Sequence, residues 1–152
     1  MSDRQPFDQL ASKCRLDGAR AFVVGASGGI GSAVVRQLAA AGAAVVGGAR
    51  STEPIARLAV DAASGDRLKG AVAIDVRHPP SVERAFKDVI RTLGGLDVVV
   101  IAAGVSSRQN VVDMHVSEFD RIVDTNLRGL LRVSCQVSTP RPTRRARLRS
   151  SA

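Results

Sequence analysis

Aromatic residues are nearly absent from this sequence, which contains no tyrosine, no tryptophan and only four phenylalanines. The core must therefore be built from valine, alanine, leucine and isoleucine. No apolar run approaches the ~20 residues of a membrane-spanning helix. Residues 1–17 mix charges with no apolar block, which argues against a signal peptide. A length of 152 residues with 45% hydrophobic content indicates one globular domain that needs no membrane partner.

Cysteine and histidine are also scarce. The two cysteines, Cys14 and Cys135, lie far apart and lack the spacing of metal ligands. We expect both to be free thiols in a reducing cytoplasm. The two histidines, His78 and His115, fall in predicted loops without partner residues, so we expect them at the surface. No metal site is predicted.

The net charge of +8 is concentrated at one end of the sequence. Residues 1–137 contain 17 Lys and Arg against 14 Asp and Glu, which gives +3, and residues 138–152 add five arginines and no acid. Five arginines without aromatic neighbours would bind nucleic acid only weakly and non-specifically, so no specific nucleic-acid partner is expected. Because residues 138–152 also lack hydrophobic periodicity, we predict a disordered basic tail after a folded domain at 1–137.

Aliphatic runs alternate with segments of helical periodicity along the folded part. Strands are predicted at 19–24, 43–48, 70–76 and 96–103, and helices are predicted to begin near residues 30, 51, 80 and 117. Unbroken aliphatic runs are typical of strands that are buried on both faces of a parallel sheet. The sequence therefore predicts an α/β fold, a Rossmann-like doubly wound parallel sheet of about four strands in the order 3-2-1-4.

Glycines dominate the connection between the first strand and the first helix. Gly25 allows a tight turn, Gly29 lets a phosphate approach the backbone, and Gly31 lets the helix pack on the strand. A helix N-terminus favours bound negative charge. An ordinary glycine-rich connection is the alternative, but the strand–turn–helix context favours a dinucleotide-binding turn. Its predicted residues are Gly25, Ser27, Gly28, Gly29, Ile30 and Gly31.

Four motifs in sequence order resemble the short-chain dehydrogenase/reductase family. They are the turn Gly25-x-x-x-Gly29-x-Gly31 preceded by Leu16-Asp17-Gly18, the pair Asp75-Val76, the run 96–104 that ends in Ala103-Gly104, and the segment 124–129 around Asn126. The resemblance covers about residues 16–137. Two departures are Val24, where the family has threonine, and Ile101-Ala102, where it has two asparagines.

This resemblance assigns roles to residues outside the glycine turn. It implies that Asp75 and Val76 contact the adenine ring, that Ala103 and Gly104 lie beside the cofactor, and that Asn126 is the asparagine of the catalytic tetrad. When the residues are considered without the resemblance, Asp75 and Asn126 each have a simpler interpretation. Asp75 could be a turn residue at a strand end, and Asn126 could merely interrupt a helix, since asparagine is a poor helix former.

The end of the second strand indicates which cofactor is preferred. An NAD site places a carboxylate about 20 residues beyond the glycines, but Ala49 stands at that position. The next residue, Arg50, could hold the 2′-phosphate of NADP through a charge-assisted contact. The alternative is a solvated loop arginine. We predict NADP rather than NAD.

The absent tyrosine matters most in the light of this resemblance. The family moves a hydride between the nicotinamide and a carbonyl or alcohol substrate, with a tyrosine as proton donor or acceptor and a lysine four residues later. The three lysines lie outside the predicted site, so Asn126 is the one tetrad residue that carries over.

We therefore expect a C-terminally truncated oxidoreductase that is inactive alone. The abrupt change of composition after Val137 suggests a shift of the reading frame. The preference for arginine over lysine, 19 to three, fits a GC-rich gene, in which such a shift would produce residues of this kind. The alternative function is a non-catalytic NADP-binding or dimerising module, and the family resemblance allows a homo-oligomer. Without further strands, the fourth strand and last helix should expose apolar surface and leave the chain marginally stable.

Overall fold

The computed structural model describes residues 15–58 and 65–138. The strands are β1 (Arg20–Val24), β2 (Ala44–Ala49), β3 (Leu68–Ala73) and β4 (Val98–Ile101). The helices are α2 (Gly29–Ala40), α3 (Glu53–Leu58), α4 (Pro79–Leu93), α5 (Val116–Val123) and α6 (Gly129–Ser138). Two 3-10 turns, η1 (Gly65–Arg67) and η2 (Val111–Asp113), and a π-helical segment, η3 (Asp124–Arg128), complete the order. Apart from Ser138, which ends α6, the predicted tail lies outside the described residues.

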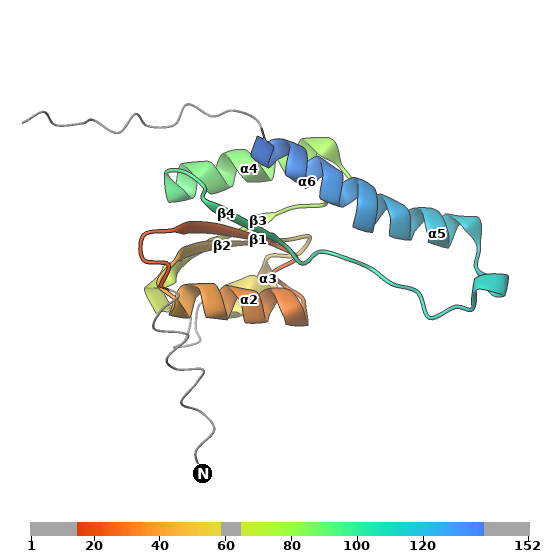
Figure 1. The fold of residues 1–152 in the computed structure, drawn as a ribbon, viewed down its shortest axis with the longest axis horizontal. Helices are drawn as coiled ribbons and strands as arrows, with labels where there is room; N and C mark the ends of the chain where they lie inside the picture. Colours follow the sequence, from red (N-terminus) through yellow and green to blue (C-terminus); the bar gives the residue numbers. More distant parts are fainter. Residues whose placement is uncertain (1–14, 59–64, 139–152) are drawn as a thin grey trace, which may run out of the picture.

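The four strands form one parallel sheet in the order β3-β2-β1-β4, which confirms the predicted topology. Helices α2 and α3 cover one face of the sheet, and α4 and α6 cover the other (Figure 1). Because all four strands run the same way, the turns that follow them gather at one edge. The candidate site residues lie at this carboxyl edge.

Alternation along β1 explains why its apolar run is continuous. Ala21 and Val23 pack in the core beneath α2 and α3, whereas Phe22 and Val24 pack in the core beneath α4 and α6. All four side chains are fully buried. The ring of Phe22 meets Phe86 of α4 edge-on at 5.3 Å, so two of the four phenylalanines anchor the second core.

Strand limits differ from the sequence prediction where pairing stops. β3 ends at Ala73 rather than at residue 76, because the chain turns away after the Ile74 N–H donates to Ala49 O. β4 is limited to four residues by its pairing with Ala21–Val24 of β1. Its other edge has no strand partner among the described residues.

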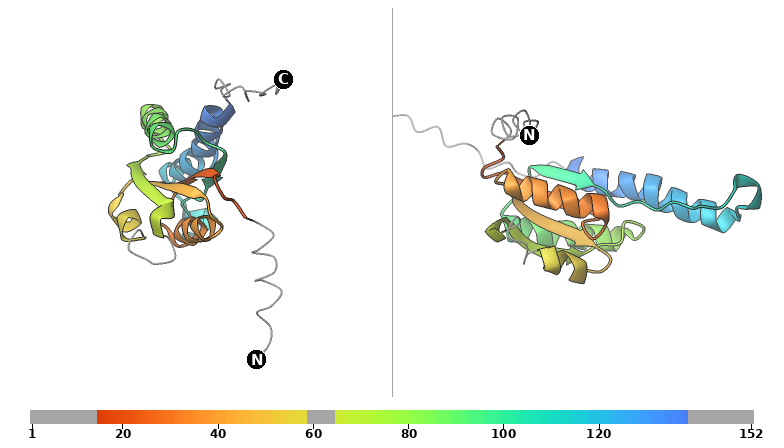
Figure 2. Two further views of the ribbon diagram at one scale, coloured as in Figure 1. Left: turned by 90° about the vertical axis from the view of Figure 1, so that its left-hand side faces the viewer. Right: turned by 90° about the horizontal axis from the view of Figure 1, so that it is seen from below.

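The last predicted helix is not α-helical throughout. η3 inserts a π-helical turn between α5 and α6, and α5 with η2 projects beyond the carboxyl edge of the sheet (Figures 1 and 2). Large apolar side chains are exposed on η2, α5, η3 and α6, and the sequence predicted such exposure for the last helix. They include Val111, Val112, Val116, Phe119, Leu127, Leu130, Leu131 and Val137. Among the described residues, no helix has the length and apolarity to cross a membrane.

Candidate functional site

The glycine turn after β1 is held against both neighbouring strands. Gly25 has φ +89°, a conformation that side-chain-bearing residues rarely adopt. The N–H groups of Gly25 and Ala26 both donate to the carbonyl of Gly48 on β2, at 2.7 and 3.0 Å. A Cβ atom on Gly25 would lie 2.4 Å from the backbone nitrogen of Ala103, so the turns after β1 and β4 touch.

The other glycines of the turn differ in what surrounds them. A Cβ on Gly31 would lie 2.1 Å from the carbonyl oxygen of Gly25, so the absence of a side chain here lets the helix pack closely against the turn. Apart from its chain neighbours and the nearby backbone of its own helix, Gly29 has no described atom within 4 Å of such a position. Gly28 is the N-cap of α2, and no side chain caps this end. Ser27, Gly28, Gly29 and Ile30 are exposed, so the uncapped helix terminus is open to an anion.

A cavity of about 300 Å³ opens at the carboxyl edge and is lined by the turns after all four strands. Such a position, between the β1 and β4 turns, is where open α/β sheets bind their ligands. Eight predicted residues line it: Gly25, Ser27, Gly28, Arg50, Asp75, Val76, Ala103 and Gly104. Four others do not: Gly29, Ile30, Gly31 and Asn126.

Arg50 directly follows the end of β2 and lines this cavity. Its side chain is exposed and makes no hydrogen bond or ion pair with any residue in the described ranges 15–58 and 65–138. The guanidinium is therefore available to a ligand. Ala49 beside it is buried and brings no carboxylate, as the sequence indicated.

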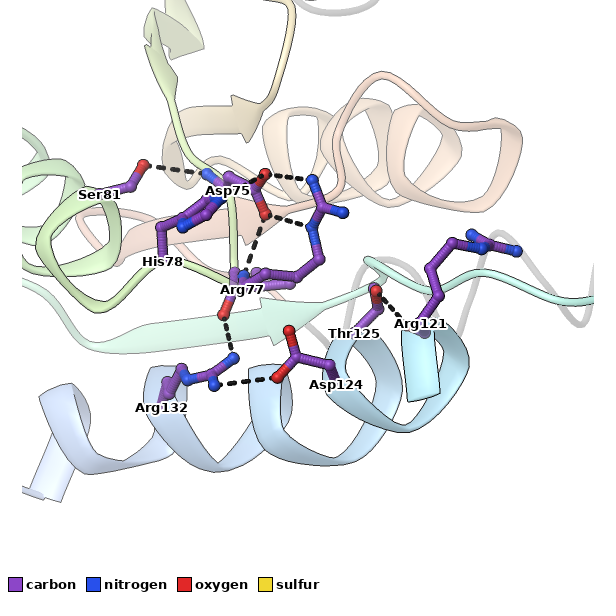
Figure 3. A network of polar contacts seen from close by, with 9 residues as sticks. Asp75, Arg77, His78, Ser81, Arg121, Asp124, Thr125 and Arg132 are labelled. Atoms are coloured by element: carbon purple, nitrogen blue, oxygen red, sulfur yellow. Dashed lines mark hydrogen bonds and ion pairs between the residues drawn. The ribbon is translucent and has the colours of Figure 1, made fainter. Parts of the chain in front are cut away.

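Asp75 lies just beyond β3 and is held at both its backbone and its side chain (Figure 3). Its N–H donates to Ser81 Oγ at 3.0 Å. Its Oδ1 accepts from the Arg77 N–H at 3.0 Å and Nε at 3.1 Å, and its Oδ2 accepts from Arg77 Nη2 at 2.7 Å. These contacts lower the pKa of Asp75 from 3.8 to about 2, so the carboxylate is ionised at neutral pH.

Val76 connects the β3 turn with the last helix. Its side chain is buried, and its carbonyl accepts a hydrogen bond from Arg132 Nη1 at 3.3 Å. The same guanidinium donates through Nη2 to Asp124 Oδ1 at 2.9 Å (Figure 3). Arg132 therefore fastens α6 and η3 to the turn that carries Asp75 and Val76.

Asn126 lies in the π-helical segment and pairs with the backbone of one residue. Its Oδ1 accepts from the Val105 N–H at 2.9 Å, and its Nδ2 donates to the Val105 carbonyl at 2.8 Å. Asn126 Oδ1 is also 3.5 Å from the position of a Cβ on Gly104. Both functional groups of the amide therefore hold the turn after β4, and the side chain is outside the cavity lining. A π turn within a helix often marks a functional position.

Sequence reasoning missed several residues of the cavity wall, among them Arg77, Arg121 and Thr125. Arg77 could have been found, because it directly follows the Asp75-Val76 pair. Arg121 and Thr125 carry no such signal. Their alignment on one wall follows from the helix around η3, where Thr125 Oγ1 donates to the Arg121 carbonyl at 2.8 Å.

Among the described residues, neither the histidines nor Cys135 are part of the cavity lining. His78 and His115 are exposed as predicted, although His78 Nε2 lies 3.7 Å from Asp75 Oδ2. Cys135 is exposed on α6, and Cys14 lies outside the described residues. Within the described ranges, no group of three His, Cys, Asp or Glu side chains could hold a metal ion.

Comparison with known proteins gives one consistent result. The family model described as short chain dehydrogenase matches residues 19–144. The 3-oxoacyl-(acyl-carrier-protein) reductase FabG of Vibrio cholerae is 39% identical over 119 residues, which are 78% of this chain and 48% of that protein. Elsinochrome reductase 1 of Elsinoe fawcettii is 36% identical over 124 residues, 80% of this chain and 46% of that protein.

Solved structures agree in fold. A short-chain type dehydrogenase/reductase from Mycobacterium marinum superposes with a TM-score of 0.75 at 35% identity, covering 82% of this chain and 51% of that one. A 3-ketoacyl-(acyl-carrier-protein) reductase from Brucella melitensis, complexed with NADH, has a TM-score of 0.73 at 30% identity and covers 81% and 50%. The chain spans about half the length of the curated relatives it matches.

Proposed function

This chain belongs to the short-chain dehydrogenase family, and from that membership we propose that it is the NADP-binding part of an oxidoreductase. The observation that supports the proposal is the cavity at the carboxyl edge, whose lining includes Gly28 at the N-terminus of α2 and also Arg50, which has no partner among the described residues. A dinucleotide offers a pyrophosphate to the first and a 2′-phosphate to the second.

The residues present fit such a cofactor. Gly25 and Gly28 leave backbone rather than side chains in the lining, and no side chain competes for the first N–H groups of α2. We propose that Gly29, Ile30 and Gly31 act through this helix terminus without lining the cavity themselves. Asp75 and Val76 would hold the adenine ring, and Ala103 and Gly104 would approach the nicotinamide half.

When bound, NADP(H) would supply or accept a hydride, and a carbonyl or alcohol compound would be the partner substrate. We propose that Asn126 contributes by holding Val105, and with it the turn that borders the substrate side. The 152 residues include no tyrosine to donate or accept the oxygen-bound proton. We therefore propose that this chain binds cofactor without turning over substrate.

A second proposal is a non-catalytic module that binds NADP or dimerises. The exposed leucines of η3 and α6, Leu127 and Leu131 among them, favour an apolar contact on that helix. Cofactor binding without carbonyl reduction agrees with both proposals. Carbonyl reduction by the 152-residue chain would contradict the first proposal's account of the missing proton donor.

Arg50→Ala tests the cofactor preference. Because Arg50 has no other partner in the described chain, its loss should weaken NADPH binding about tenfold and leave NADH binding nearly unchanged. The measurement is a fluorescence titration of the purified chain with each dinucleotide. Arg57→Ala is the matched control, since Arg57 is similarly exposed on α3 but does not line the cavity. Equal binding of NADPH and NADH by the unmutated chain would overturn the preference.

A further inference from the structure

The charges of the cavity wall are unevenly distributed. Its charged lining residues are Arg50, Asp75, Arg77 and Arg121. Asp75 is the acidic member of this set, and its ionised carboxylate repels any phosphate that enters. A positive charge must therefore neutralise the negative charge of the Asp75 carboxylate if the cavity is to hold an additional phosphate.

Arg77 covers this carboxylate, in the sense that its guanidinium forms an ion pair with it and neutralises its charge. It contacts both carboxylate oxygens through Nε and Nη2 and adds its own backbone N–H (Figure 3). The side chains of Asp75 and Arg77 are 22% and 35% exposed, so the pair forms part of the cavity wall rather than a solvated surface bridge.

Neighbouring cations are engaged with other acids. Arg121 donates to both oxygens of Glu118 at 2.8 and 2.7 Å. Arg132 donates to Asp124, and Arg128 also faces that carboxylate at 3.9 Å. Without Arg77, Asp75 would keep only His78 as a basic neighbour in the described part of the chain, at 3.7 Å. Among the described residues, Arg77 is the arginine that contacts Asp75.

We propose that Arg77 is a specificity-determining residue, which by covering Asp75 allows the cavity to accept the extra phosphate of NADP. This inference rests on the proposed function and extends it. NADH lacks the 2′-phosphate, so its binding affinity should fall much less than that of NADPH when the Asp75 carboxylate is left without Arg77. If the role of Arg77 were purely structural, its loss would weaken the binding of both dinucleotides equally. The ratio of their dissociation constants is therefore the informative quantity.

The test is a double-mutant cycle on the full chain, using NADPH and NADH as probes. Arg77→Gln should lower the preference for NADPH over NADH about tenfold. Adding Asp75→Asn to that variant should restore the preference, because no carboxylate remains to be covered. Any loss of adenine contact caused by Asp75→Asn affects both dinucleotides and cancels in the ratio.

Two outcomes would overturn the inference. An unchanged ratio in Arg77→Gln would show that covering Asp75 has no role in selection. A lowered ratio that Asp75→Asn does not restore would mean that Arg77 contacts the phosphate directly. If Arg77→Gln fails to fold, the single variant Asp75→Asn still tests the idea, since its preference for NADPH should equal or exceed that of the unmutated chain. Absence of binding by either dinucleotide to the unmutated chain would instead refute the proposed function.

Discussion

Gly25 is the residue on which the geometry of the site most depends. Its positive φ and its contact with the backbone of Ala103 are two separate reasons why no side chain fits there. Gly29, four residues on, has open space around it and no backbone strain. The two glycines therefore allow a structural role to be separated from a ligand role.

Substitution of each by alanine should give opposite effects on stability. Gly25→Ala should lower the free energy of unfolding by at least about 2 kcal/mol, because it adds an unfavourable φ to a backbone clash. Gly29→Ala should leave it unchanged or raise it by up to about 1 kcal/mol, since alanine is the better helix residue. Urea denaturation measures both. If Gly25→Ala were as stable as the unmutated chain, the tight contact with Ala103 would be wrong.

For individual residues, the sequence predicted those features that depend on the spacing of neighbouring residues along the chain. The glycine turn and Arg50 were predicted from strand ends and glycine patterns, and Asp75 from the family resemblance; all three contribute to the cavity lining. The pairing of Asp75 with Arg77 was not predicted, because it depends on how the chain turns after β3. Arg121 was not predicted because a helix far along the sequence brings it to the cavity.

Among the elements, the π-helical segment η3 is the feature that helical periodicity could not reveal. A single extra residue in a turn leaves the apolar pattern nearly intact, so the sequence predicted one continuous helix. Asn126 lies in the π-helical turn, and the backbone remains helical from α5 through η3 into α6. The side chain nevertheless has a definite task, since it pairs with both backbone groups of Val105.

Asn126→Ala tests that task. Loss of both hydrogen bonds should reduce the free energy of unfolding by about 1–2 kcal/mol and speed amide exchange in the turn after β4, because the Val105 N–H loses its acceptor. Hydrogen exchange followed by mass spectrometry reports the local effect. Asn110→Ala is the control, since Asn110 precedes η2 without a side-chain capping bond. Unaltered exchange at Val105 would show that the paired amide does not hold the turn.

For the molecule as a whole, the sheet order and its two layers followed from the alternation of aliphatic runs and helical segments. The limits of β1 and β2 were predicted to within one residue, whereas those of β3 and β4 were not, because these strands end where their pairing stops and not where apolar residues stop. The exposed apolar surface of the last helix was predicted. The projection of α5 and η2 past the carboxyl edge could be seen only in the structure (Figure 2).

Two residues of α6 should respond differently to mutation. Val133 is fully buried in the core beneath α4, so Val133→Ala should cost about 2 kcal/mol of unfolding free energy. Leu131 is 63% exposed, so Leu131→Lys should change stability by no more than about 0.5 kcal/mol while raising solubility. Thermal unfolding and the concentration at which the chain precipitates measure the two effects. A large destabilisation by Leu131→Lys would mean that this face is covered in solution.

The contact between the turns after β1 and β4 also has a consequence for the order of folding. β1 pairs in register with β4, Val24 opposite Ile101, although β2 and β3 lie between them in the chain. During synthesis the glycine turn emerges early, but its partner Ala103 emerges only after β2, β3 and α4 have been made. Pairings of such long sequence separation form slowly. A nascent chain should therefore acquire affinity for its ligand abruptly, as β4 docks, and ligand capture would report that late event.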